Sequence, residues 1–193
     1  MASIKLTGDT SGEITISAPA VAGTNTLTLP AETGTIQTTA NIQVDMWRMS
    51  SDLTANNGVV GVDSTVERVD DATFSKIGTG MAETSGKWTF PATGLYEIKV
   101  QAFWVCSAGD SAIVQTQGSS DDGSNYDVLA WASGGDLDNA KGTFYSQCFF
   151  NCTNTSTHKV QFNCISIGSG SSLQSSSSFN VTSFSFIRLG DSQ

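Results

Sequence analysis

The stretch SGKWTFPATGLYEI, residues 85–98, decides the fold of this chain. Residues 86–90 form a short aromatic run, and Pro91 and Gly94 bracket residues that favour a turn. A long run of apolar and strand-forming residues follows over 94–105. The stretch therefore predicts a β-strand, a tight turn and a second, longer strand.

The same succession of strand-forming runs and turn residues extends from about residue 66 to residue 189. Runs rich in Val, Ile, Phe and Thr are separated by clusters of Gly, Ser, Asp and Asn. Turns spaced by roughly 8–12 residues are typical of a β-sandwich or a jelly roll. We therefore expect an all-β jelly roll, with strands near 73–77, 86–90, 94–105, 111–118, 126–132, 142–152, 158–168 and 179–189. In the last of these, Phe184, Phe186 and Leu189 alternate with Ser183, Ser185 and Arg188.

Three regions are predicted along the 193 residues. Residues 1–40 form a β-rich arm, residues 41–65 a linker with the first strand of the jelly roll, and residues 66–193 the jelly-roll domain proper. A short amphipathic helix over 41–53 is the alternative to that first strand.

The arm consists of short fragments in which aliphatic residues alternate with threonine or other polar residues. Such alternation places the aliphatic side chains on one face of a strand. Fragments this short bury too little area to fold alone. We therefore expect the arm to pack on other subunits or to add strands to another protein. The candidate anchoring residues are Ile4, Leu6, Ile14, Ile16, Leu27 and Leu29.

Composition argues against several partners. The chain carries 18 acidic and 9 basic residues, a net charge of −9, which disfavours binding to nucleic acid or to an anionic membrane surface. No stretch approaches the roughly 18 apolar residues of a membrane-spanning helix. The first residues, Met1 to Leu6, lack the pattern of a secretory signal.

Residues 85–98 resemble the strand-turn-strand of the complement globular-head and tumour-necrosis-factor (TNF)-like superfamily, where an aromatic strand leads through Gly-Leu-Tyr into a long core strand. Residues 183–189, SFSFIRL, look like the closing strand of the same family. The resemblance spans roughly residues 44–189 and implies a homotrimer packed through an apolar central surface. Tyr96, Phe184 and Phe186 are the candidates for that trimer interface, and a place in the core of one subunit is the alternative.

A second resemblance is to structural proteins of tailed, especially marine, bacteriophages. The arm, residues 5–30, is similar to a recurrent N-terminal module of virion proteins, and residues 45–49, 67–71 and 77–81 resemble the jelly roll that accompanies it. The likeness implies a protein made in the host cytoplasm and displayed on the virion surface, anchored to the major capsid protein or to a tail or collar protein. A fibrous shaft is missing from the sequence. We therefore expect a capsid decoration protein, with a tail-fibre or appendage knob that binds a receptor or glycan as the alternative.

The sequence offers little for catalysis. His158 lies in a polar turn, and the pairs at 70–71 and 121–122 are adjacent carboxylates, which point to opposite faces if they lie on a strand. We expect no enzyme activity. Asp136 and Asp138 are weak candidates for a Ca²⁺ site, and no other metal or cofactor is expected.

The cysteines and one tryptophan complete the candidates. Cys106, Cys148, Cys152 and Cys164 are interpreted as buried free thiols rather than as metal ligands. Trp131 precedes a polar loop and is a candidate to stack on a sugar ring of a host-surface glycan, although filling space in a strand is the alternative.

Overall fold

The computed structural model describes residues 3–8, 10–17, 24, 42–54, 57–107, 110–135 and 141–192. Contacts divide the chain into two units, Met1–Ile36 and Gln37–Gln193, and each is described by itself. The predicted boundary at residue 40 lies outside the described residues.

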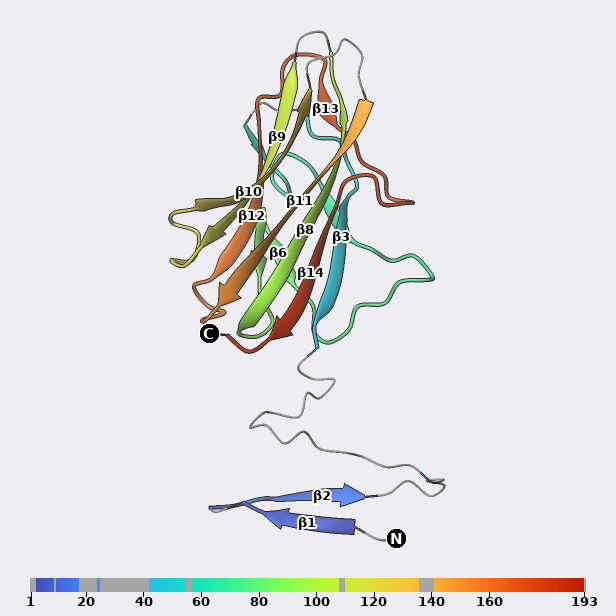
Figure 1. The fold of residues 1–193 in the computed structure, drawn as a ribbon. Coiled ribbons are helices and arrows are strands. Elements are labelled where there is room, and N and C mark those ends of the chain that lie inside the picture. Colours follow the sequence, from blue (N-terminus) through green and yellow to red (C-terminus); the bar gives the residue numbers. More distant parts are fainter. Residues whose placement is uncertain are drawn as a thin grey trace. The chain divides into compact units, whose positions relative to one another are not determined.

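The larger unit is a sandwich of two antiparallel sheets, as Figure 1 shows. Among the described residues, the strands of this unit are β3 (Val44–Met49), β4 (Gly58–Val59), β5 (Val66–Arg68), β6 (Ala82–Thr84), β7 (Lys87–Thr89), β8 (Gly94–Val105), β9 (Ser111–Ser119), β10 (Asp127–Gly135), β11 (Lys141–Cys152), β12 (Lys159–Ile165), β13 (Ser172–Leu173) and β14 (Ser183–Gly190). One sheet has the order β11-β8-β14-β3-β5, with β13 beside β8, and we call it the front sheet. The other has the order β10-β9-β12-β7-β6, with β4 beside β12, and we call it the back sheet.

The long strand β8 shows how the sequence builds the front sheet. Its side chains alternate between buried and more exposed positions, as expected for a strand with one face on a core. Gly94 begins the strand with φ of 154°, and a side chain there would collide with Nε of Arg188 and the carbonyl oxygen of Gly190. The glycine of the Gly-Leu-Tyr turn is therefore required by the close approach of β14.

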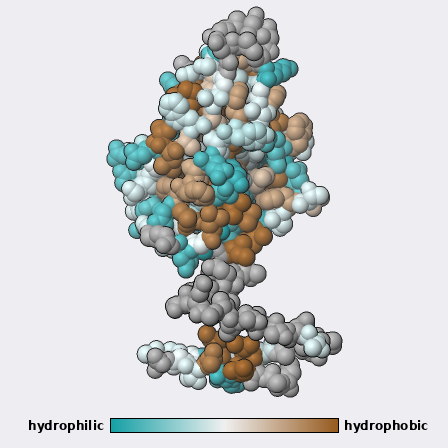
Figure 2. Space-filling view, viewed as in Figure 1, coloured by the Kyte–Doolittle hydropathy of each residue, from teal (hydrophilic) through white to brown (hydrophobic). Residues whose placement is uncertain are grey.

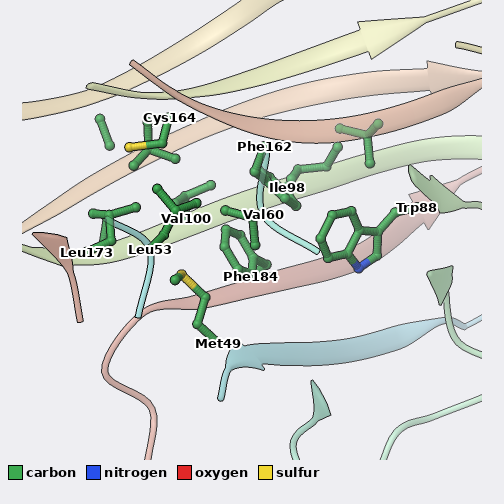
Figure 3. Packing of buried hydrophobic residues seen from close by; sticks show 14 of the residues in the cluster. Met49, Leu53, Val60, Trp88, Ile98, Val100, Phe162, Cys164, Leu173 and Phe184 are labelled. Carbon is green, nitrogen blue, oxygen red and sulfur yellow. The ribbon is translucent and has the colours of Figure 1, made fainter. Parts of the chain in front are cut away.

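The core lies between the sheets and is rich in aromatic residues (Figure 3). Trp88 and Phe162 from the back sheet meet Phe184 from the front sheet, with ring centroids of Phe162 and Phe184 4.2 Å apart. All three side chains are fully buried. Burying an aromatic side chain contributes on the order of 2–3 kcal/mol, so these contacts are a main source of the stability of the sandwich.

Two expectations about local structure are wrong. Residues 73–77 form turns and a single bridge between Ile77 and Val44 rather than a strand. In β14, Leu189 is exposed whereas Arg188 turns inward and donates to the carbonyl oxygen of Thr93. Arg188 lies two residues after Phe186, so strand alternation places it on the same inward face. The alternative helix is excluded over Val44–Met49, which is strand β3.

The smaller unit contains a two-stranded antiparallel hairpin of β1 (Ser3–Thr7) and β2 (Glu13–Ser17). Its turn includes Gly12 at φ of 86°, a left-handed conformation that glycine adopts readily.

Candidate functional site

The predicted interface residues are part of the core of one subunit. Tyr96, Phe184 and Phe186 are 0–1% exposed in the single chain, so the prediction that they form the trimer interface is wrong. The Tyr96 hydroxyl donates to the carbonyl oxygen of Ala92, and burial raises the pKa of Tyr96 to about 12. The three residues stand on the inward face of their strands, where the back sheet covers them.

The outward face of the front sheet carries the large apolar side chains that sequence analysis did not select. Tyr145 and Phe149 on β11 are 70% and 58% exposed. Cross-strand register places Phe149 in a row with Glu97, Ile187 and Val44, from β8, β14 and β3. Figure 2 shows this face, with apolar side chains in brown gathered around a hydrophilic patch. We call it the front face.

Polar side chains occupy the middle of the front face. Lys99 on β8 forms an ion pair with Glu97 at 3.1 Å, and lies in a row with Gln147 and Ser185. A hollow beside this row is lined by Met46, Lys99, Gln101, Tyr145, Gln147 and Ser185. The face therefore combines exposed aromatic rings, which are enriched where subunits meet, with a Lys–Glu pair of a kind that is depleted there.

Near one edge of the front face, Arg48 forms ion pairs with a cluster of carboxylates. Its Nε lies 2.7 Å from Glu67, and its two terminal nitrogens contact Asp70 and Asp71. The guanidinium is 1% exposed, and the carboxylates hold its pKa above the usual value although burial opposes this. Asp70 and Asp71 were expected to point apart. They follow β5 in irregular backbone instead, which lets both reach one arginine.

The hairpin presents a second apolar surface. Ile4 pairs with Ile16 and Leu6 with Ile14, so the four side chains share one face. They are 47–66% exposed, and the opposite face carries Lys5, Thr15 and their polar neighbours. A hairpin alone in water is marginally stable. This face, which we call the aliphatic face of the arm, is therefore a candidate surface for a partner. The other two candidate anchoring residues, Leu27 and Leu29, lie outside the described residues.

Sequence comparison finds no family model that matches and no match among curated proteins. Comparison of structures does find similar folds. Murine APRIL at pH 5.0 is 13% identical with a TM-score of 0.55, over 77% of this chain and 99% of that chain. The Eiger TNF of S. frugiperda is 11% identical with a TM-score of 0.58, over 79% of this chain and 95% of that chain. The sandwich has a TNF-like jelly-roll fold. At this identity the likeness concerns the fold alone, and it agrees with the fold that residues 85–98 and 183–189 implied.

The TNF-like jelly roll holds its four cysteines as free thiols. Cys106, Cys152 and Cys164 are buried and Cys148 is half-buried. Burial raises the pKa of Cys148 to about 11 and that of Cys164 to about 12, which suppresses the reactive thiolate. These residues fill space in the sandwich as the sequence indicated.

The remaining candidates for chemistry are dispersed over the TNF-like jelly roll. His158 is half-buried against the ring of Phe150, and its ring nitrogens lie near the hydroxyls of Thr153 and Thr157. Within the described residues, no group of three or more His, Cys, Asp or Glu side chains is arranged to hold a metal ion. Asp136 and Asp138 lie outside those residues. Nor does the described part of the chain include a helix long and apolar enough to cross a bilayer.

Proposed function

We propose that this chain is a non-enzymatic structural protein of a virion, which trimerises through its TNF-like jelly roll and attaches to the particle through its arm. The observation that carries the proposal is that each unit has a face on which large exposed apolar side chains gather, with Tyr145 and Phe149 on the jelly roll and the four aliphatic side chains of the hairpin on the arm. The aliphatic face of the arm and the front face of the jelly roll are two separate surfaces that require partners.

The trimer rests on the front face. Exposed aromatic and aliphatic side chains on one sheet favour contact with further copies, and threefold packing through an apolar surface is what the resemblance to the TNF-like superfamily implies. The candidates for the interface are Tyr145 and Phe149, with Ile187 in the same cross-strand row as Phe149, in place of the buried Tyr96, Phe184 and Phe186. In a cyclic trimer this face meets a different surface of the next subunit, so one substitution acts at all three interfaces.

The arm supplies attachment. Within the described residues the strands β1 and β2 pair only with each other, and the aliphatic face of the hairpin offers four side chains to a hydrophobic surface. Strand addition gives affinity through backbone hydrogen bonds and register through the side chains. Three arms from one trimer would bind a particle with considerable avidity. The major capsid protein or a tail or collar protein is the proposed partner.

Placement on a phage particle rests on the resemblance of residues 5–30 and of the jelly-roll segments to tailed-phage virion proteins. We favour capsid decoration because a short arm followed by a compact jelly roll suits a protein that covers a particle, and the virion surface is then the proposed location. No nucleic acid, membrane, metal or cofactor takes part in this proposal. A tail-fibre or appendage knob that binds a host receptor is the second candidate, favoured by one observation, the 57% exposure of Trp131.

Trimerisation is tested by the mass of the purified protein in multi-angle light scattering. We expect a trimer for the full chain and for a chain that lacks residues 1–40. Changing Tyr145 and Phe149 together to Asp should give a folded monomer, whereas Val62→Asp, at a site equally exposed but outside the front face, should leave the trimer intact. A truncated chain that is monomeric would show that the arm itself makes the oligomer.

Attachment is tested by co-sedimentation with tailed-phage particles assembled without this chain. Wild type should sediment with the particles, and Ile4→Asp with Ile16→Asp should abolish this while leaving the trimer intact. Thr15→Asp is the matched control, because Thr15 lies on the opposite face of the same hairpin. Equal binding by all three proteins would contradict the assigned role of the aliphatic face.

A further inference from the structure

The outward face of the back sheet carries an exposed tryptophan that the core does not use. Trp131 on β10 is 57% exposed, whereas Trp88 and Trp104 are at most 1% exposed. Its neighbour Ala132 faces the core at 3% exposed, so the indole points away from the sandwich. Space-filling, the alternative for Trp131, therefore does not account for it.

A chain of glutamine side chains leads to this tryptophan. The amide nitrogen of Gln161 on β12 donates to the amide oxygen of Gln117 on β9 at 2.7 Å. The amide nitrogen of Gln117 in turn donates to the amide oxygen of Gln115 at 2.7 Å. Gln115 is paired across the strands with Trp131, so the chain ends beside the indole ring.

Gln115, the last of the three hydrogen-bonded glutamines, has a fixed side chain whose amide can still bind a ligand. Gln115 is 8% exposed, so its side chain is held in place by its surroundings. The amide oxygen of Gln115 accepts from Gln117, so the amide nitrogen of Gln115 lies at the free end of the row of three glutamines. Within the described residues that nitrogen has no protein acceptor, and it is not among the polar atoms sealed from solvent. A preorganised donor therefore stands next to an exposed aromatic face.

The charges of the surroundings select the class of ligand. Trp131, the three glutamines and Val128, which pairs with Gln117 across the strands, are all uncharged, although the whole chain carries a net charge of −9. A cationic ligand would find no carboxylate among these residues, and an acidic ligand would be repelled by the chain as a whole. An aromatic face beside amide groups suits a neutral ring that has apolar C–H faces and hydroxyl edges.

We propose that Trp131 and Gln115 form a binding site for a neutral hexose unit of an oligosaccharide or polysaccharide. The pyranose ring stacks on the indole, and the amide nitrogen of Gln115 donates to a ring hydroxyl. Gln117 and Gln161 are positioning residues, because they orient the Gln115 amide without reaching the sugar. The site goes beyond virion assembly, and a decoration protein and an appendage knob would both use it to hold the particle near a cell surface.

The test uses the full-length protein on an array of neutral and acidic oligosaccharides, followed by titration of the best neutral glycan with tryptophan fluorescence as the readout. We expect binding to neutral glycans, with a shift of the emission of Trp131 to shorter wavelength. Trp131→Ala and Gln115→Ala should weaken binding at least about tenfold, as loss of a stacked ring or of a buried hydrogen-bond donor does. Val62→Ala is the control and should bind as wild type does.

Three outcomes would overturn the site. They are a silent array, binding confined to acidic glycans, and equal binding by Trp131→Ala and wild type. Acrylamide quenching of the ligand-free protein supplies a check that does not depend on the glycan chosen. Strong quenching that Trp131→Phe removes is expected, and its absence would show that a second copy of the chain covers the indole. The mass and co-sedimentation results do not depend on these outcomes, so failure of the sugar site and failure of the proposed assembly role are distinguishable.

Discussion

The jelly roll and the arm are built from the same strand pattern and reach opposite results. In the jelly roll, Ile98 alternates with polar neighbours and is 1% exposed, whereas in the arm Ile14 does the same and is 66% exposed. The difference is the second layer, because the back sheet covers Ile98 and no described part of the chain covers Ile14. Alternation therefore specifies which side chains share a face, and a second layer is needed to turn that face into a core.

The largest expected effect contrasts one core residue with one arm residue. Phe184→Ala removes a fully buried ring stacked on Phe162 and should lower the free energy of unfolding by about 3–5 kcal/mol. Ile16→Ala should change it by less than about 0.5 kcal/mol. Urea denaturation followed by tryptophan fluorescence measures both. Similar losses from the two substitutions would mean that the arm packs on the jelly roll and that the contrast is false.

Next in size is the ion cluster at the edge of the front face. Arg48→Met leaves Glu67 and Asp71 facing each other without their shared cation, and should cost about 3 kcal/mol in the same assay. The surface pair of Lys99 and Glu97 is the matched control, and Lys99→Met should cost less than about 1 kcal/mol because water screens the pair. If Arg48→Met lowered the free energy of unfolding as little as the control does, the ion cluster would contribute little to the stability of the fold.

A smaller effect concerns the turn after β9. The carboxylate of Asp121 accepts hydrogen bonds from the side chain and backbone of Asn125 and from the hydroxyl of Ser119, which lowers its pKa from 3.8 to about 2. Because the pKa is lower in the folded chain, the contribution of Asp121 to stability is present above pH 4 and is lost as the pH falls toward 2. Carboxyl NMR titration should give a midpoint near 2, and a midpoint near 4 would refute the proposed hydrogen bonding.

The smallest change is expected in the thiols. At pH 8 a pKa of about 11 at Cys148 leaves roughly 100-fold less thiolate than the ordinary value of 9.0 would. Ellman's reagent should therefore react slowly with the folded jelly roll and at full rate in guanidinium chloride. The variant Cys148→Ser identifies the contribution of that residue. Rapid reaction of Cys148 in the native protein would mean that β11 opens readily and is less firmly packed than the core strands.

Sequence patterns predicted most of the jelly roll and few of its surfaces. The strands β8, β9, β11, β12 and β14 were anticipated because each is a long run between clear turn residues. The short strands β4, β5, β6 and β13 were missed because pairs and triplets of residues carry no visible period. Residues 73–77 contain the apolar Phe74 and Ile77, but strand β3 pairs along Trp47–Met49 with Val66–Arg68 and meets this segment at the single bridge between Val44 and Ile77.

The sequence predicted the exposed surfaces less well than the strands, and strand β11 shows why. Strand β11 has aromatic residues on both faces, with Phe144 and Phe150 inward and Tyr145 and Phe149 outward. A strand that is apolar on both faces indicates two covered sides. That signal was available in the sequence and points to a partner, but it does not say which face the core takes.

By itself, then, the sequence determined that the chain is all-β and that its body is a jelly roll, and it predicted a partner for the arm. These properties follow from local patterns, namely alternation, turn residues and segments too short to fold alone. Only the tertiary structure decided that Tyr96, Phe184 and Phe186 are internal, that Asp70 and Asp71 converge on Arg48, and that Gln161, Gln117 and Gln115 line up toward Trp131. Each depends on which strands become neighbours and which face the second sheet covers, and residues far apart in the chain settle both.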